Sequence, residues 1–367
     1  MLRVGTTGWN LRTLVDVQVY GGAGQRILHG DSIYAGPVFT TEGPLEFTYP
    51  PFAAIVFAPL GWIPSSLWPL CTVVSTAGIG TAIVVWWCKN LHRPQWTGWV
   101  LAGFFLSQPI ISTLGFGQIN VVLAGMAVAD IAATQARRNF RGTLVGIAAA
   151  IKLTPAFFAV WFVVRKDWVG LRNLVLGAGG ATLLTACVLP ADSAAYFLDK
   201  LHDTNRVGNT AFAHNAALKG VLARLHAPEF LWIILAALVL ALVVLVARRV
   251  NTPLGTGALL SSSVVAFGAL LLSPISWTHH WVWLPLAGVV ALTRPDMVRI
   301  GAIGLVLGLV GPILFIGAYA GDPHWLLTIT TSSYALYAVA FSLSAWRSAH
   351  RMVEPSPELP PNSLQKL

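Results

Sequence analysis

Apolar runs long enough to cross a lipid bilayer recur along most of this 367-residue chain, and short polar stretches separate them. A helix needs roughly 20 apolar residues to cross about 30 Å of hydrocarbon. The pattern therefore predicts an all-α integral membrane protein with about 9–11 membrane segments. The predicted regular spans are residues 66–88, 98–113, 118–134, 172–190, 229–247, 256–272, 279–293, 298–318 and 325–345.

Two further apolar segments do not fit a simple crossing. Residues 49–64, YPPFAAIVFAPLGWIP, hold about 12 apolar residues between prolines, or roughly 18 Å of helix. Residues 142–164 are long enough, but Lys152 and Pro155 interrupt the middle of that segment. Neither segment is expected to form a regular transmembrane helix.

Composition supports a membrane protein and argues against a soluble one. Hydrophobic residues make up 56% of the chain and charged residues 10%, and the mean hydropathy is +0.69, whereas a soluble domain is about 25% charged. The 15 tryptophans suit membrane interfaces. A net charge of +9 would suggest nucleic acid in a soluble protein, but basic cytoplasmic loops explain it here. No nucleic-acid partner is expected.

The cysteines carry no sign of a metal site or a disulfide framework. Cys71, Cys88 and Cys187 lie in apolar segments without CxxC spacing, which is typical of small core residues. We therefore expect no metal and no cofactor. The N-terminus also lacks the apolar region of a signal peptide.

Lysine and arginine set the predicted orientation, because cytoplasmic loops are enriched in them. If the basic clusters are cytoplasmic, two of them flank the single segment 142–164 on the same side. That segment would then enter and return as two half-helices broken near Pro155, and an ordinary kinked crossing is the alternative. The clusters are Lys89/Arg93, Arg137/Arg138/Arg141, Arg165/Lys166/Arg172, Arg248/Arg249, Arg294/Arg299 and Arg347/Arg351.

This orientation divides the chain into one membrane domain, residues 1–346, and a Pro-rich cytoplasmic tail, residues 347–367, that is expected to be disordered. The largest outer segments are 1–65 and 191–228. Within the first, residues 16–29 are predicted to form a short helix in the interface plane. Its apolar face would carry Val15, Val19, Ala23 and Ile27.

Asp16 is the first candidate for chemistry in these outer segments. Asp16, Tyr20 and Gly24 share one helix face at i, i+4 and i+8. Gly24 would leave room beside that face for a bulky group. The alternative is that Asp16 only caps the helix, which is a preferred role for aspartate.

A lysine and two histidines are the next candidates. Lys152 lies in the middle of an apolar run, where an ammonium is costly and indicates a functional site. The segment SPISWTHHWVWLP, residues 273–285, holds Trp277, His279 and His280. The aromatic residues alone are ordinary interface anchors, but an imidazole there can also donate to a phosphate or a sugar hydroxyl.

The remaining candidates are polar or aromatic residues that could bind sugar or phosphate. The alternative for each is a helix cap or a solvated loop. They are Glu46, Tyr49, Gln118, Asn120, His214, Asn215 and Lys219. Together the candidates indicate an outer-face cavity with one carboxylate, cationic donors and aromatic walls. Such a cavity suits glycosyl transfer from a lipid phosphate, in which the carboxylate takes the acceptor proton and cations stabilise the leaving phosphate.

Several short motifs of the chain resemble those of a known family. DVQVY, LHGDSIY, FTYPPFAA, GQIN, IKLTPA, HNAALKGVL and SPISWTHHWVW occur in this order between about residues 13 and 285. The chain resembles glycosyltransferase family 87 (DUF2029), and within it the actinobacterial polyprenol-phosphate-mannose-dependent α-(1→2)-mannosyltransferases that include the phosphatidylinositol mannoside enzyme. The Asp-x3-Tyr motif and the Ser-Pro…His-His segment are the most specific parts.

The resemblance implies a multi-pass GT-C-type helix bundle in the plasma membrane with an extracytoplasmic active site. It implies inverting transfer of mannose from polyprenyl-phosphate-mannose to a glycolipid or lipoglycan, namely phosphatidylinositol mannoside, lipomannan or lipoarabinomannan. The family's catalytic acid matches Asp16, as general base, and its histidine matches His279 or His280. The expectation that Lys152 contacts the donor phosphate comes from its position alone.

One feature departs from the family pattern. The family has a transmembrane helix ahead of the loop that carries the acid, whereas only 15 residues precede Asp16 here, and they are not apolar enough to span. We expect either a start codon assigned too late or a shortened form.

Other functions fit parts of the pattern. A polyprenyl-phosphate-arabinose arabinofuranosyltransferase is the near alternative, because the sequence does not separate the two sugars. A transporter or flippase would suit the broken helix and the mid-membrane lysine. The missing inverted repeat and the gathering of polar groups on one face argue against it. A scaffold role would leave the cost of Lys152 unexplained.

Overall fold

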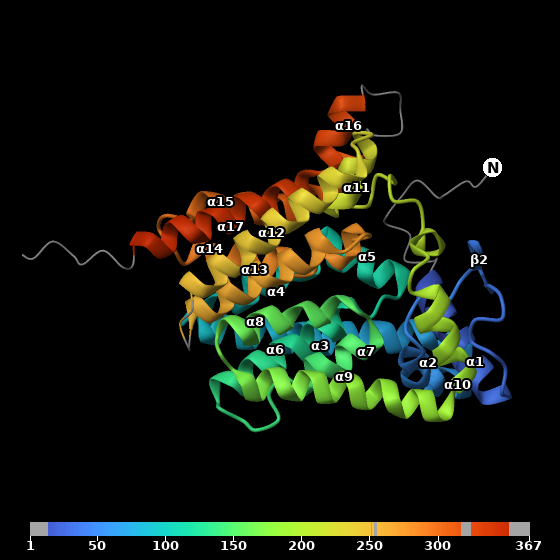
Figure 1. The fold of residues 1–367 in the computed structure, drawn as a ribbon. Coiled ribbons are helices and arrows are strands. Elements are labelled where there is room, and N and C mark those ends of the chain that lie inside the picture. The colour runs from blue at the N-terminus through green and yellow to red at the C-terminus, as the bar shows by residue number, and fades with distance from the viewer. Residues whose placement is uncertain (1–13, 251, 253–254, 317–323, 352–367) are drawn as a thin grey trace, which may run out of the picture.

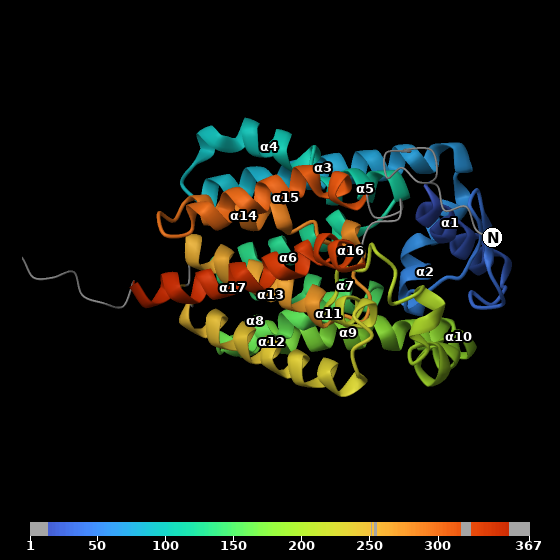
Figure 2. The same cartoon turned by 90° about the horizontal axis from the view of Figure 1, so that it is seen from above.

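The chain folds into a bundle of long, roughly parallel helices with a cluster of short elements at one end (Figures 1 and 2). The computed structural model describes residues 14–250, 252, 255–316 and 324–351. The expected all-α membrane bundle is confirmed. The bundle contains α3 (Trp68–Asn90), α4 (Thr97–Phe105), α5 (Gln108–Phe116), α6 (Asn120–Gln135), α7 (Thr143–Ile151), α8 (Ala159–Val164), α9 (Trp168–Val188), α12 (Glu229–Arg249), α13 (Thr256–Leu272), α14 (Leu284–Leu292), α15 (Val298–Ile316) and α17 (Ser333–Arg351).

The end cluster brings together the two segments expected to be the largest outer loops. Ser32 donates to a carboxylate oxygen of Asp192 at 2.5 Å, and Arg206 donates to the carbonyls of Phe47 and Thr48. The elements of these segments are α1 (Val15–His29), the hairpin β1 (Val38–Thr40) and β2 (Gly43–Leu45), α2 (Pro51–Phe57), α10 (Pro190–Ala195) and α11 (Leu218–Arg224), with α16 (His324–Thr331) next to α11. Single helical turns link the elements: η1 (Ala58–Trp62), η2 (Ser65–Leu67), η3 (Pro94–Trp96), η4 (Thr154–Phe158), η5 (Tyr196–Lys200), η6 (Thr204–Val207) and η7 (Thr278–His280).

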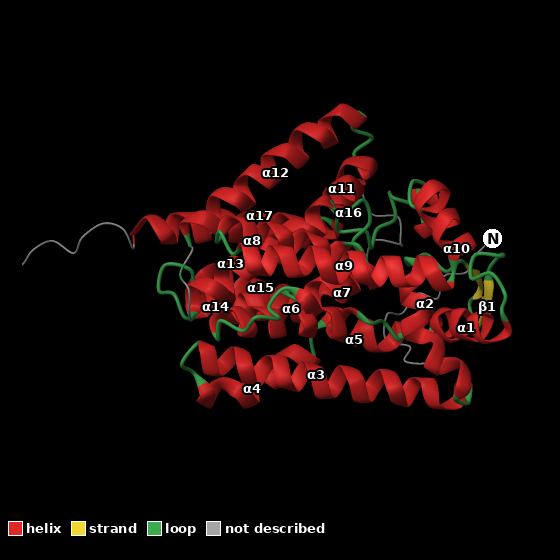
Figure 3. Cartoon of the chain, turned by 60° about the horizontal axis from the view of Figure 1, so that its bottom comes forward, coloured by secondary structure: helices red, strands yellow, loops and turns green. Residues whose placement is uncertain are grey.

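Helix length supports membrane crossing for part of the bundle. In the described ranges, three helical segments are long and apolar enough to span: Ser65–Asn90, Trp168–Val188 and Glu229–Arg249. Five shorter apolar helices accompany them: Pro51–Trp62, Asn120–Gln135, Thr154–Val164, Thr256–Leu272 and Val298–Gly311. Helix α12 inclines away from the bundle (Figure 3) and exposes apolar side chains such as Ile233 and Leu238, as expected of a lipid-facing helix. The exact number of crossings stays a prediction.

Three predicted spans are wrong as continuous helices. Segment 98–113 is split between α4 and α5, which are bent by 55° at Leu106 and Ser107. Pro109 follows the bend as an early residue of α5, where a missing N–H costs nothing, but it cannot continue α4. Segment 325–345 breaks at Ser332, between α16 and α17. Segment 279–293 is helical only from Leu284, because η7 precedes it.

The segment 142–164 turns back on itself, as the basic clusters predicted. α7 ends at Ile151, Lys152 is extended, and η4 leads into α8. A Cβ on Gly142, at the start of α7, would lie 2.0 Å from the carbonyl oxygen of Gly170. A Cβ on Gly170 would also lie 2.3 Å from the ring of Phe162, near the end of α8. Both ends of the segment therefore meet the same residue of α9, and the turning point carries Lys152.

The predicted helix at residues 16–29 is confirmed as α1, but the capping alternative for Asp16 is ruled out and the expectation about Gly24 is wrong. The residue at the N-cap is Leu14, so Asp16 lies inside the first turn and is not the cap. The space beside Gly24 is filled by the chain itself, because a Cβ there would lie 2.5 Å from the carbonyl oxygen of Phe57. Gly24 thus permits close packing of α1 on α2 and η1.

Two apolar cores hold these parts together. The larger one fills the bundle around α3, α6, α13, α14 and α17. The smaller one joins α1 to the end cluster through Tyr20, Phe47, Tyr49, Phe57 and Trp68. The rings of Tyr20 and Phe57 are stacked at 4.1 Å between centroids. The smaller core therefore fixes the helix that carries Asp16. Residues 1–13 and 352–367, most of the expected tail, lie outside the described residues, whereas 347–351 continue α17.

Candidate active site

The start of α1 is held against the loop between α5 and α6. The backbone N–H of Leu14 donates to the carbonyl of Gly115 at 3.0 Å. Gly117 has φ +73, and a Cβ there would lie 2.8 Å from Val17. A residue with a side chain would be strained at that backbone angle and would push α1 away. This close approach places Asp16 beside Gln118.

Gln118 orients a set of buried polar groups around Asp16. Its Oε1 accepts hydrogen bonds from the hydroxyls of Tyr20 at 3.1 Å and Tyr49 at 3.2 Å, and the two hydroxyls lie 2.7 Å apart. With its oxygen engaged in this way, the amide nitrogen of Gln118 is left to donate to the carboxyl group of Asp16. The structure thus brings together four residues that the sequence singled out.

Burial raises the pKa of Asp16 to about 6, although the hydrogen bond from Gln118 and the charge of Lys152 both act to lower it. Desolvation disfavours the charged carboxylate, and this effect outweighs the two favourable interactions. A carboxyl group with a pKa near the working pH can exchange protons readily, which is the property of a general base.

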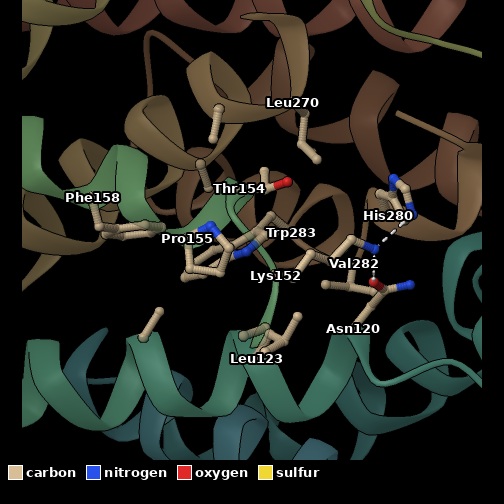
Figure 4. A pocket seen from close by; sticks show the side chains of 14 residues that line it. Asn120, Leu123, Lys152, Thr154, Pro155, Phe158, Leu270, His280, Val282 and Trp283 are labelled. Carbon is tan, nitrogen blue, oxygen red and sulfur yellow. Dashed lines mark hydrogen bonds between the residues drawn. The ribbon is translucent and has the colours of Figure 1, made fainter. Parts of the chain in front are cut away.

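Lys152 lies at the turn between α7 and η4 and points toward His280 and Asn120 (Figure 4). Its Nζ is 3.0 Å from Nε2 of His280 and 3.3 Å from Oδ1 of Asn120. It also lies 5.4 Å from the centroid of the Tyr49 ring. Among the described residues, no carboxylate oxygen lies within 4 Å of this ammonium. Its close partners are neutral, so its charge is available to an anion.

The two adjacent histidines point to different surroundings. His280 faces Lys152, whereas His279 is 7% exposed, packs on Phe116 and has no hydrogen-bond partner for its Nε2 within the described chain. Burial and the charge of Lys152 hold the pKa of both imidazoles well below the usual value. Both rings are therefore neutral near pH 7, and His280 can accept from the Lys152 ammonium.

An apolar cavity opens from this polar cluster (Figure 4). Its empty space is about 530 Å³, including the open mouth. Only a few polar side chains line it, chiefly Asn120, Lys152, Thr154 and His280. The other lining residues are Leu123, Ala124, Ala127, Pro155, Phe158, Ala266, Ala269, Leu270, Val282 and Trp283, from α6, the segment around η4, α13 and the stretch before α14. The cavity thus has a cationic end and a long apolar wall.

The sequence did not reveal these apolar walls. The alanines at 124 and 127 on α6 and at 266 and 269 on α13 make the space, because their small side chains leave a gap between the two helices. A pair of alanines three residues apart on each helix was the available signal. Alanine is so common in apolar helices that this signal could not be separated from ordinary packing.

Four sequence candidates lie away from both the cavity lining and the polar cluster around Asp16. Asn215 is fully buried, and its side chain makes four backbone hydrogen bonds that tie residues 210–217 to residues 274–276, so it acts as a brace and not as the expected substrate contact. Trp277 is half-buried against Phe212. Lys219 pairs with Glu229 at 3.0 Å. Glu46 is exposed after the hairpin.

His214 lies close to His279 but outside the cavity. Its ring stacks on Phe212 with 5.3 Å between the ring centroids, and a positive charge on His214 would lower the pKa of His279. Burial lowers its pKa. It therefore belongs to the surroundings of His279 and does not line the cavity. No group of three or more His, Cys, Asp or Glu side chains in the described ranges is arranged to hold a metal ion.

Comparison with known proteins gives consistent matches. The profile of glycosyltransferase family 87 matches residues 47–274. The polyprenol-phosphate-mannose-dependent alpha-(1-2)-phosphatidylinositol mannoside mannosyltransferase of Mycolicibacterium smegmatis is 36% identical over 318 residues, covering 78% of this chain and 72% of that protein. The corresponding phosphatidylinositol pentamannoside mannosyltransferase of Mycobacterium tuberculosis is 36% identical over 341 residues, covering 88% and 75%.

Among solved structures, ArnT from Cupriavidus metallidurans bound to undecaprenyl phosphate matches with a TM-score of 0.45 and 14% identity, covering 93% of this chain and 74% of that one. The profile match covers most of the chain, and the sequence identities hold over more than two thirds of both relatives. The chain is a multi-pass membrane protein that belongs to glycosyltransferase family 87.

Proposed function

We propose that this protein transfers a mannosyl residue from polyprenyl-phosphate-mannose to a glycolipid or lipoglycan acceptor at the outer face of the plasma membrane. The transfer inverts the anomeric centre and forms an α-(1→2) linkage. The names of the relatives favour a phosphatidylinositol mannoside as acceptor. The observation that carries the proposal is the Lys152–His280 pair at the cationic end of an apolar cavity, within electrostatic reach of Asp16.

The cavity suits a polyprenyl phosphate in both charge and polarity. Lys152 binds the phosphate, His280 orients its ammonium by accepting at Nε2, and Asn120 holds the lysine in place through its Oδ1. The prenyl chain lies along Leu123, Phe158 and Leu270, where contact with apolar side chains replaces contact with lipid. Because no carboxylate oxygen of the described residues lies within 4 Å of the ammonium, binding a phosphate there breaks no existing ion pair.

Asp16 supplies the base. Its carboxylate removes the proton from the acceptor hydroxyl as that oxygen attacks the anomeric carbon of the donor sugar. The new bond joins the acceptor oxygen to that carbon, while the bond from the carbon to the phosphate oxygen breaks. The electron pair of the broken bond stays on the polyprenyl phosphate, whose charge Lys152 stabilises. Asp16 then passes its proton to water.

The orientation of the site is supported by the basic residues. The Lys152 end of α7 faces the end cluster, whereas the opposite end of α7 lies beside the Arg141–Asp167 ion pair at 2.8 Å. Basic loops are typical of the cytoplasmic side. The end with Asp16 and the cavity is accordingly the extracytoplasmic one.

The experiment is a transfer assay with the purified protein in nanodiscs. Decaprenyl-phosphate mannose and decaprenyl-phosphate arabinose are supplied separately with phosphatidylinositol mannoside, and the product is analysed by mass spectrometry and linkage analysis. We expect an α-(1→2)-mannosylated product from the first donor only. If arabinose were transferred instead, the protein would be an arabinofuranosyltransferase and the proposed donor sugar would be wrong. If the donor crossed the membrane of proteoliposomes and no product formed, the protein would not be a transferase.

A further inference from the structure

The histidine turn, residues 277–281, has little internal support. Its helical part, η7, is only three residues long, with short-range bonds from His280 N–H to the Trp277 carbonyl and from Trp281 N–H to the Thr278 carbonyl. A turn of this size cannot hold its own geometry in isolation. The position of His279 and His280 must therefore come from what packs against the turn.

One support is Gln108 at the start of α5. Its Nε2 donates to the hydroxyl oxygen of Thr278 at 3.0 Å, and also to Ser112 at 2.9 Å in the next turn of α5. Its Oε1 accepts from the hydroxyl of Tyr334 on α17 at 3.0 Å. Gln108, Thr278 and Tyr334 are all at most 4% exposed. Buried hydrogen bonds of this kind specify one arrangement, because losing a partner leaves a polar group unsatisfied.

A second support acts on the next residue of the turn. The backbone carbonyl of His279 accepts two hydrogen bonds, one from the hydroxyl of Thr113 at 3.1 Å and one from Nδ2 of Asn120 at 3.0 Å. Thr113 is fully buried on α5 and does not line the cavity. Asn120 also accepts a hydrogen bond from Lys152, so the same side chain links the lysine to the histidine turn.

We propose that Gln108 and Thr113 of α5 are positioning residues for the catalytic step, because they fix the histidine turn through Thr278 and the His279 carbonyl and so set His280 against Lys152. The proposal rests on the proposed function for the identity of the reaction only. Helix α5, which is bent by 55° from α4, packs directly against the turn.

The test uses near-isosteric changes that remove one hydrogen bond each. Thr113→Val and Thr278→Val delete the hydroxyl groups, and Thr113→Ser restores one. We expect kcat to fall about tenfold in each valine variant, since an error of about 1 Å in a catalytic group can cost up to roughly 100-fold. The KM for decaprenyl-phosphate mannose should change by less than about threefold, and Thr113→Ser should recover most of kcat.

Thr185→Val is the matched control. Thr185 is also buried, but its hydroxyl donates only to the Ala181 carbonyl of its own helix, α9. This variant should keep wild-type kcat. Combining Gln108→Met with Thr278→Val should cost no more than Gln108→Met alone, because that change already removes the bond to Thr278 together with the bonds to Ser112 and Tyr334. Full additivity, or wild-type kcat in Thr113→Val, would overturn the proposal.

A measurement that does not depend on enzymatic turnover can test the positioning role independently of the proposed function. Carbethoxylation of His280 by diethyl pyrocarbonate, followed by mass spectrometry, reports access to its ring. Thr113→Val and Thr278→Val should label at least about threefold faster than wild type, while Thr185→Val should not. If no donor is turned over but this difference appears, the proposed function fails and the positioning role stands. Equal labelling in all variants, with unchanged melting temperature, would remove the positioning role.

Discussion

Nζ of Lys152 lies 3.0 Å from Nε2 of His280, although 127 residues separate the two in the sequence. The segment that carries Lys152 enters the bundle, turns and returns, and the turn meets η7. The pair gives an apolar cavity one cationic end. The proposed phosphate site depends on this contact.

Replacing Lys152 with methionine should nearly abolish transfer. The side chain keeps its approximate length and apolar stem but loses the charge that stabilises the leaving phosphate. We expect kcat/KM for decaprenyl-phosphate mannose to fall about 100- to 1000-fold, in line with the loss of one electrostatic group from a buried site. Steady-state kinetics measures this loss.

The control is Lys219→Met, which removes a lysine that pairs with Glu229 away from the cavity. It should remain within about twofold of wild type. If Lys152→Met were equally active, the donor phosphate would have to bind elsewhere.

Transfer should depend on pH through Asp16. Because burial raises its pKa to about 6, the carboxylate needed as base is lost below about pH 6, and kcat/KM should fall as the pH drops through that value. The free energy of unfolding should change with pH in the opposite direction. Because the pKa of Asp16 is higher in the folded chain than in the unfolded chain, Asp16 makes a contribution to stability that is fully present below about pH 4 and is lost as the pH rises through about 6. A pH–rate profile and a pH series of melting temperatures check the two directions.

The side-chain amide of Gln118 should influence the pH at which activity is lost on the acid side of the pH–rate profile. Its hydrogen bond lowers the pKa of Asp16, so Gln118→Leu should move the acid limb of the pH–rate profile to higher pH. The same change removes the acceptor of the Tyr20 and Tyr49 hydroxyls. Tyr49→Phe leaves the amide in place and should shift the limb much less. An acid limb that stays in place in Gln118→Leu would argue that another group titrates.

Much of the helix bundle could be predicted from the sequence, because the position of each helix depends on the residues within it and beside it. Hydropathy located most bundle helices, and the basic clusters on both sides of 142–164 favoured a returning segment over a kinked crossing. The bend before Pro109 and the break at Ser332 were missed, since each lies inside an apolar stretch of spanning length. Asn215 looked like a ligand because polarity alone does not show that backbone groups already occupy a side chain.

The meeting of Asp16, Gln118, Lys152 and His280 rests on contacts between residues far apart in the chain. Periodicity carries no information on such contacts. Ordered family motifs could indicate that these residues belong to one site, but not which histidine faces the lysine. The structure resolves that point, because His280 contacts Lys152 while the His279 carbonyl is held by Thr113 and Asn120.

The apolar wall of the cavity should be needed for donors with long prenyl chains. Ala127→Phe would place a ring between α6 and the residues around Phe158. We expect the KM for decaprenyl-phosphate mannose to rise at least about tenfold, with a smaller effect for a short citronellyl donor. Ala241→Phe, on the exposed side of α12, is the control and should leave both values unchanged. An equal effect on both donors would place the prenyl chain outside the cavity.

The most direct test of the proposed mechanism is Asp16→Asn, measured for both transfer and donor binding in the same preparation. The substitution keeps the shape of the side chain and removes its ability to take a proton. We predict that transfer falls at least about 1000-fold, while the affinity for decaprenyl-phosphate mannose and the melting temperature stay close to wild type. Asp199→Asn, at an exposed position in the segment expected to be outer, should behave as wild type. Transfer by Asp16→Asn at more than about a tenth of the wild-type rate would contradict the assignment of Asp16 as the base.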